Sequence, residues 1–305
     1  MSASAHEPLA ASVVSIVIEF DTSANLHASY YSFSLKEQPL PDTTRVTEAA
    51  AYIASEYKAH RMIEPFPQYL GPQGIEEAYA VQQAYLEMLS KTRGPFGGYK
   101  IAYTTATMRD RLGIDQPALG RIFAAEIRKT PATLNAADYV KLGVECEVAV
   151  RLSADLPASG APYTRESVTA AIGEVMAGIE VIDSRGPESV DGLDRIHAGI
   201  ALNISSAGAV LGQPVANWRD VDIAAARGVV EINGSVVGEG RGSDVMGHPF
   251  EALAWLANAL AEKGASLAAG MVVITGSIVT PKFVEPGDTA VVRIDGLGEA
   301  RFTVR

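Results

Sequence analysis

The chain has 305 residues, of which 48% are hydrophobic and 20% charged, an ordinary composition for a globular protein with a large core. Lys and Arg total 25 against 36 Asp and Glu, and the resulting net charge of -11 argues against a nucleic-acid partner. No stretch reaches the roughly 18 apolar residues of a membrane span, so we expect no membrane partner.

Residues 1–45 form a leader whose role the sequence leaves open. Its strand-like run at residues 13–20 has no basic region before it and is followed by acidic residues. This pattern argues against a signal peptide and predicts a cytoplasmic protein. The one cysteine of the chain, Cys146, excludes an intrachain disulfide and a zinc site built from cysteines.

Two amphipathic helices are predicted after the leader. Val46, Ala49 and Ile53 recur at helical spacing, and a second helix runs from Gly74 to the Gly94-Pro95 pair that ends it. We therefore expect a helical cap over residues 46–95.

The next two segments carry isolated polar residues. A strand at residues 97–103 has Lys100 as its one charge, which must find a partner or a ligand unless it lies at a strand edge. The segment 112–123 is interpreted as a loop, with Asp115 and Gln116 just ahead of a rigid proline. Such loops are candidates for a functional site, although many are simple turns.

A short apolar strand, residues 144–150, carries two carboxylates one residue apart. Because side chains alternate along a strand, Glu145 and Glu147 share one face, and Cys146 lies on the other. A second apolar strand at residues 177–182 brings a third carboxylate, Glu180. A divalent metal bound by the three is one interpretation, and an exposed face with solvated or ion-paired glutamates is the other; spacing alone leaves them about even.

The rest of the chain is mostly β. Residues 186–199 are polar and are interpreted as a mobile flap, followed by the small-residue segment 203–208. Asn-Gly at residues 233–234 predicts a hairpin, and a helix with an apolar stripe begins at Pro249. No period of 20 to 50 residues repeats, which excludes a solenoid.

Several motifs together, in this order, resemble the fumarylacetoacetate hydrolase superfamily from about residue 46 to the C-terminus. The chain looks most like the hydratases of 2-hydroxypenta-2,4-dienoate and the 4-oxalocrotonate decarboxylases of aromatic meta-cleavage pathways. The motifs are Gly98-Tyr99-Lys100-Ile101, Leu112-Gly113-Ile114-Asp115-Gln116-Pro117, Val144-Glu145-Cys146-Glu147, Ile179-Glu180-Val181-Ile182-Asp183-Ser184-Arg185, Gly247-His248-Pro249 and Thr275-Gly276-Ser277.

The resemblance implies an α+β fold, with a mixed and strongly curved β-sheet, a β-roll, behind the N-terminal helical cap. Residues 96–305 would be the metal-binding catalytic domain, with residues 46–305 one structural unit in a homo-oligomer. It also implies Mg2+ or Mn2+ as the cofactor and a small 2-oxo or 2-hydroxydienoic acid as the substrate. The residues expected to act are Glu145, Glu147 and Glu180 as metal ligands, Lys100, Asp115 and Ser205 in catalysis, and Gln116 and Ser277 in substrate binding.

Two details favour one reaction within this group. The triplet at residues 115–117 and the Thr-Gly-Ser at residues 275–277 resemble hydratases, which add water to a 2-hydroxy-2,4-dienoate. Two departures are Ala118, where hydratases usually carry an acid, and Leu202, where they tend to have Asp. The alternatives are therefore a 4-oxalocrotonate-type decarboxylase, an acylpyruvate C–C hydrolase or tautomerase, and, less favoured, a non-enzymatic pathway partner.

Overall fold

A computed structural model describes residues 42–63, 67, 69–186 and 192–305. The segment Pro41–Arg305 is one compact unit. The strand-like run predicted at residues 13–20, and with it nearly all of the leader, lies outside the described residues. The division of the remainder at residue 95 stays a prediction.

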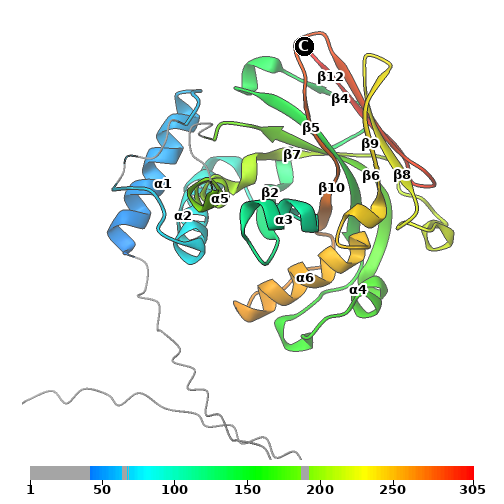
Figure 1. Ribbon diagram of the computed structural model, residues 1–305, viewed down its shortest axis with the longest axis horizontal. Helices are drawn as coiled ribbons and strands as arrows, with labels where there is room; N and C mark the ends of the chain where they lie inside the picture. Colours follow the sequence, from blue (N-terminus) through cyan, green and yellow to red (C-terminus); the bar gives the residue numbers. More distant parts are fainter. Residues whose placement is uncertain (1–41, 64–66, 68, 187–191) are drawn as a thin grey trace, which may run out of the picture. The chain divides into compact units, whose positions relative to one another are not determined.

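Helices α1 (Thr43–Lys58), α2 (Ile75–Arg93) and α5 (Gly192–Ala201) lie together beside the sheets (Figure 1). The Asp42 carboxylate caps α1 by accepting hydrogen bonds from two backbone N–H groups, and glycines border α2 at both ends. Apolar residues of α1 and α2 form a second core with Phe123 and Leu202. This core attaches the helical layer to the strands that carry the candidate site.

A seven-stranded sheet forms the centre of the fold, with the strand order β2-β1-β10-β5-β6-β7-β3. Strand β1 runs parallel to β10, and β3 parallel to β7, while the other neighbours are antiparallel. The strands are β1 (Phe96–Ala102), β2 (Ala118–Phe123), β3 (Ile127–Lys129), β5 (Leu142–Leu152), β6 (Ile172–Asp183), β7 (Ser206–Leu211) and β10 (Val272–Phe283).

A second sheet has five strands in the order β4-β12-β11-β8-β9. The β8–β9 hairpin turns at Asn233 and Gly234, whose positive φ angles of 52° and 79° suit the predicted Asn-Gly turn. The main core lies between the two sheets, where Val144, Cys146 and Val148 of β5 are fully buried. The strands are β4 (Ala132–Leu134), β8 (Arg227–Ile232), β9 (Ser235–Arg241), β11 (Thr289–Ile294) and β12 (Gly298–Val304).

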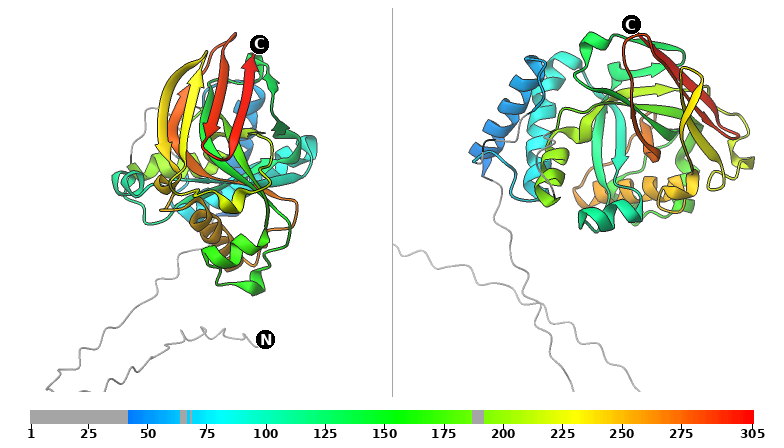
Figure 2. Two further views of the ribbon diagram at one scale, coloured as in Figure 1. Left: turned by 90° about the vertical axis from the view of Figure 1, so that its right-hand side faces the viewer. Right: turned by 45° about the horizontal axis from the view of Figure 1, so that its top comes forward.

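Helices α4 (Arg165–Ala171) and α6 (Pro249–Glu262) lie side by side at one end of the sheets, and α3 (Ala106–Leu112) follows β1 (Figures 1 and 2). The short 3₁₀ segments are Ala124–Glu126, Ala136–Asp138, Ala158–Gly160, Asn203–Ser205, Trp218–Asp220 and Gly242–Asp244. The mixed, curved sheet with its helical layer agrees with the predicted fold class.

Two local predictions were wrong. The segment 112–123 is not one loop, because residues 118–123 pair with β1 as the outer strand β2. Within the predicted flap, residues 192–201 form helix α5, whose Ile196 and Ile200 are buried.

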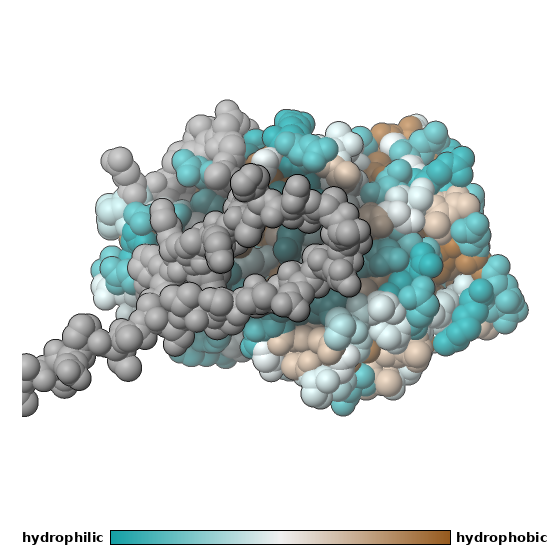
Figure 3. Space-filling view, turned by 60° about the horizontal axis from the view of Figure 1, so that its bottom comes forward, coloured by the Kyte–Doolittle hydropathy of each residue, from teal (hydrophilic) through white to brown (hydrophobic). Residues whose placement is uncertain are grey.

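The face drawn in Figure 3 mixes hydrophilic and hydrophobic residues, and among its visible described residues no broad apolar patch stands out. No helix within the described part of the chain has the length and apolar character needed to cross a membrane.

Candidate metal centre

The register between β5 and β6 brings the three predicted carboxylates together. Glu145 is paired directly with Glu180, and Glu147 lies two residues further along the same face of β5. One oxygen from each of the three side chains lies within 4.8 Å of the other two. Alternation along two adjacent strands is thus sufficient to build the cluster.

Two members of the cluster are buried and Glu145 is half-buried, which distinguishes the cluster from a solvated acidic face. Glu147 is 1% exposed and Glu180 is 0% exposed. Burial, reinforced by repulsion from Glu180 and Glu145, raises the pKa of the Glu147 carboxyl well above its ordinary value. Among the described residues, Oε1 of Glu147 and Oε2 of Glu180 are buried without a hydrogen-bond partner, and Oε1 of Glu180 lies beside the Lys100 ammonium. Buried carboxylate oxygens that converge with so few donors fit a hard divalent cation.

Lys100 supplies a cation beside the cluster. Its side chain is 3% exposed, and Nζ lies 3.1 Å from Oε1 of Glu180, which excludes the alternative of an exposed strand edge. Burial alone would lower the pKa of the ammonium, but the neighbouring carboxylates, Glu180 first, hold that pKa above its ordinary value. The lysine is therefore charged at the site.

Strand β10 closes the cluster from the other side. The backbone N–H of Gly276 donates to Oε2 of Glu147 at 2.5 Å, and the Thr275 hydroxyl donates to the Val148 carbonyl at 3.0 Å. Gly276 has φ +129°, and a Cβ there would stand 2.5 Å from the hydroxyl oxygen of Thr104. A glycine is therefore required for the backbone to reach Glu147.

The structure places the remaining predicted residues at different depths. Ser277 is paired opposite Glu147, and its hydroxyl donates to the Val279 carbonyl at 2.5 Å. Ser205 is half-buried with φ +58° in the segment after α5. Asp115 and Gln116 are exposed between α3 and β2, where Oε1 of Gln116 accepts a 3.4 Å hydrogen bond from Nε1 of Trp255. Their roles stay predictions.

The two departures from the hydratase pattern lie in apolar surroundings. Ala118, 2% exposed, packs in a cluster with Ile196 and Ile200 of α5. Leu202, also 2% exposed, belongs to the second core beneath α1 and α2. A carboxylate at either position would be buried among hydrocarbon, so these positions contribute packing in this chain.

Other polar residues singled out by the sequence have structural partners. Nδ1 of His248 accepts a hydrogen bond from the N–H of Phe250 at 3.0 Å and caps α6. Arg185 and Asp183 form a buried ion pair at 2.5 Å, which supports the end of β6. The Cys146 thiol is buried on the face opposite the glutamates. These groups stabilise elements around the cluster.

Sequence reasoning missed Asn203, whose buried side chain bonds to the backbone of β2. It also missed Thr104, which packs against the Gly276 turn. The available signal was position: Asn203 stands between a helical and a strand pattern, where asparagine favours left-handed turns.

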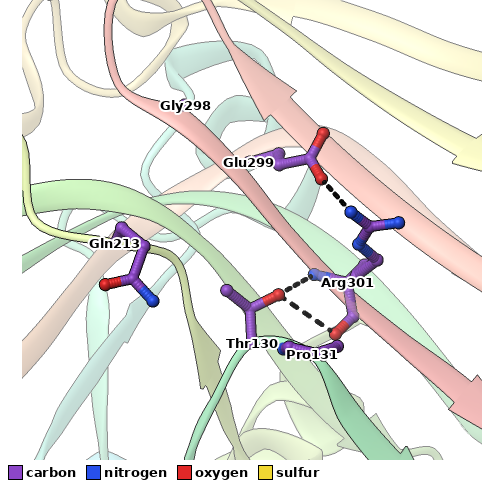
Figure 4. A pocket seen from close by; sticks show the side chains of 6 residues that line it. All are labelled: Thr130, Pro131, Gln213, Gly298, Glu299 and Arg301. Atoms are coloured by element: carbon purple, nitrogen blue, oxygen red, sulfur yellow. Dashed lines mark hydrogen bonds and ion pairs between the residues drawn. The ribbon is translucent and has the colours of Figure 1, made fainter.

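A pocket of about 370 Å³ lies elsewhere, between the β3–β4 connection and β12 (Figure 4). The Arg301 guanidinium is paired with Glu299 at 2.9 Å, and the Thr130 hydroxyl bonds to the Arg301 backbone. Its lining residues contribute no member of the carboxylate cluster. They are Thr130, Pro131, Gln213, Gly298, Glu299 and Arg301.

Comparisons with known proteins agree with this geometry. The chain is 33% identical over 265 residues to a 2-keto-4-pentenoate hydratase of Burkholderia vietnamiensis, covering 87% of this chain and 99% of that protein. It is 32% identical over 247 residues to a 4-oxalocrotonate decarboxylase of Pseudomonas putida, covering 80% of this chain and 89% of the relative. The solved 4-oxalocrotonate decarboxylase of Pseudomonas putida G7, complexed with magnesium and adipate, is 28% identical, with a TM-score of 0.78 over 87% of this chain and 98% of that one. A family model described as "Fumarylacetoacetate (FAA) hydrolase C-terminal" matches residues 123–305. The chain belongs to the fumarylacetoacetate hydrolase family.

Proposed function

We propose that the protein is a metal-dependent hydratase, a lyase that adds water to a 2-hydroxy-2,4-dienoate and gives a 4-hydroxy-2-oxo acid. The observation that carries the proposal is the cluster of the half-buried Glu145 with the buried Glu147 and Glu180, beside Lys100. Similarity to a 2-keto-4-pentenoate hydratase over 87% of the chain supports the reaction. We infer that the protein acts in the catabolism of aromatic compounds.

The cofactor is Mg2+ or Mn2+, held by the three glutamates. Three carboxylate oxygens suit these hard cations and leave coordination positions for water and substrate. The decarboxylase of Pseudomonas putida G7 was solved with magnesium, which supports the choice. When bound, such an ion supplies Lewis-acid stabilisation to the carboxylate and keto oxygens of a 2-oxo acid.

Five residues of the chain have proposed roles in substrate binding and proton transfer. The charged Lys100 ammonium binds the substrate carboxylate or stabilises negative charge that develops on the enolate oxygen. Asp115 and Ser205 position the proton or the water that adds at C4, and Gln116 and Ser277 bind substrate oxygens. For Ser277, donation to the substrate requires release of its bond to the Val279 carbonyl.

A decarboxylase acting on 4-oxalocrotonate is the second candidate. One observation favours it: the similarity to the decarboxylase of Pseudomonas putida G7 extends over 87% of the chain. The same cluster serves both reactions, because each develops an enolate on a 2-oxo acid. Ala118 and Leu202, which leave hydrocarbon where hydratases tend to carry acids, are compatible with this alternative.

The partner is a small-molecule acid, and we infer that the protein assembles as a homo-oligomer in the cytoplasm. Light scattering on the purified chain tests the assembly.

An assay of purified protein with Mn2+ tests the reaction. We expect the protein to consume 2-hydroxypenta-2,4-dienoate, which is monitored by the loss of its dienol absorbance. The product should be heavier than the substrate by one water, and no CO2 should be released. Release of CO2 from 4-oxalocrotonate without hydration would overturn the first choice in favour of the second. Cleavage of an acylpyruvate into two acids would assign a hydrolase instead. A Glu147→Gln variant is the matched control for metal dependence.

A further inference from the structure

The link between α5 and β7 has an unusual backbone. Asn203, Ile204 and Ser205 have φ angles of +56°, +50° and +58°, so three successive non-glycine residues lie in the left-handed region. Such conformations are uncommon, above all for a β-branched residue, and persist where surrounding contacts impose them. The Asn203 side chain provides two contacts at this turn, both to the backbone of Arg121.

Asn203 takes the place of a neighbouring strand beside β2. Its Oδ1 accepts a hydrogen bond from the N–H of Arg121 at 2.8 Å, and its Nδ2 donates to the carbonyl of the same residue at 2.9 Å. Among the described strands β2 is the outer one of the seven-stranded sheet, so within this part of the chain no strand pairs with its outward backbone groups. The carboxamide supplies both the donor and the acceptor from one planar group.

The same side chain lies beside Lys100. Gly120, which precedes Arg121, is paired opposite Lys100 in the β1–β2 ladder. A Cβ on Gly120 would stand 2.9 Å from Oδ1 of Asn203 and 3.0 Å from Cγ of Lys100. Both side chains therefore pack over the one face that the glycine leaves free. Asn203 borders the space in which the aliphatic stem of Lys100 can move.

We propose that Asn203 is a positioning residue, which fixes β2 against the left-handed turn and so holds the Lys100 ammonium at Glu180. The two hydrogen bonds from Asn203 fix the position of β2 relative to the turn. Gly120 leaves room for the aliphatic part of the Lys100 side chain, and the Asn203 amide bounds that room on the side away from the sheet. The part of the proposal that concerns turnover rests on the proposed function, in which Lys100 acts on the substrate. The geometric part, the placement of Nζ, does not.

Replacement of Asn203 by glycine tests the proposal, because glycine adopts φ +56° freely and loses only the side-chain contacts. We expect kcat to fall roughly 10- to 100-fold, as for a displacement of about 1 Å, while the KM and the Mn2+ dissociation constant change less than about threefold. In crystals of Asn203→Gly, Nζ of Lys100 should move away from Oε1 of Glu180, from which it lies 3.1 Å in the native chain.

Ile204→Gly is the matched control, since it relaxes the adjacent left-handed residue and keeps the Asn203 amide. Its kcat should stay within about twofold of the native value. Gly120→Ala is a second variant, whose added methyl group would press on the aliphatic part of the Lys100 side chain. It should show the same loss of kcat, and it tests the proposal if Asn203→Gly does not fold.

Native kcat in Asn203→Gly with the Lys100–Glu180 contact intact would overturn the proposal. An equal loss in Ile204→Gly would also overturn it, because the backbone turn alone would then be responsible. If the native protein hydrates no dienoate, the proposed function fails, and the crystallographic position of Nζ still decides the positioning role.

Discussion

Nζ of Lys100 lies 3.1 Å from Oε1 of Glu180, and both side chains are buried. The cation offsets one of the clustered carboxylates and leaves two more to be compensated. A bound divalent cation would balance the remainder, so folding energy and metal binding are coupled at this site.

Glu147→Gln should change the stability of the metal-free and metal-bound protein in opposite directions. Without metal, the variant loses a buried carboxylate that two others repel. We expect its free energy of unfolding to rise by roughly 1–2 kcal/mol, and its melting temperature to rise with it. With Mn2+ it should be the less stable protein, because a ligand is gone and affinity falls by more than about 10- to 100-fold. Calorimetry in EDTA and in excess Mn2+ measures both.

Glu174→Gln is the control for that crossover. Glu174 lies on the neighbouring strand, β6, but is half-exposed and paired with Arg151 of β5 at 3.0 Å. Its replacement should change the melting temperatures of the metal-free and metal-bound protein slightly and by the same amount. Equal destabilisation of both forms by Glu147→Gln would exclude the metal site.

The metal-free protein should become less stable as pH rises. Burial raises the pKa of the Glu180 carboxyl to about 8 from an ordinary 4.5, although Lys100 opposes the shift. The folded state then retains a proton that the unfolded state releases, so stability is present below pH 4.5 and lost as pH rises towards 8. Melting temperatures in EDTA between pH 5 and 8 measure this slope. Excess Mn2+ should flatten or reverse it, and the same slope with and without metal would contradict the assignment.

Lys100→Met should separate turnover from metal binding. Removal of the cation leaves Glu180 without its partner, so the metal-free protein should lose about 3 kcal/mol of stability at pH 8. Mn2+ affinity should be kept or increased, because a positive charge that repels the incoming ion is gone. Turnover should nevertheless fall by about 10²- to 10³-fold. Isothermal titration and steady-state kinetics on one preparation compare the two, and unchanged turnover would remove Lys100 from the mechanism.

Much of the metal centre was predictable because it depends on alternation along strands. Glu145 and Glu147 are two residues apart, and this alone places them on one face. That Glu180 lies directly opposite Glu145 depends on the β5–β6 register, which spacing did not determine. The family resemblance implied only that Glu180 is a third ligand. The boundaries of α2 at Gly74 and Gly94 followed from the residues that border helices.

The wrong predictions share a physical cause, since tertiary pairing decides each of them. Residues 118–123 contain a glycine and follow a proline, which favours a loop, yet pairing with β1 and the Asn203 amide makes them a strand. The polarity of α5 obscured Ile196 and Ile200, which are four residues apart and share a buried face. The bond from Gly276 to Glu147 likewise depends on a β10 register that the sequence does not display.

The metal-bound protein should lose stability on acidification through His248. Its Nδ1 accepts the hydrogen bond from the Phe250 N–H that caps α6, and a protonated imidazole cannot accept it. Burial, aided by the nearby Arg165, lowers the pKa of His248 below its ordinary 6.5, so the unfolded chain takes up the proton first. Stability is therefore full above pH 6.5 and declines as pH falls below it.

His248→Asn keeps a capping oxygen that does not titrate, and its melting temperature in excess Mn2+ should decline less than that of the native protein between pH 7 and 5.5. His197 also has a lowered pKa from burial and remains in both proteins, so the comparison isolates His248. Parallel declines in the two proteins would show that the cap is not the titrating element.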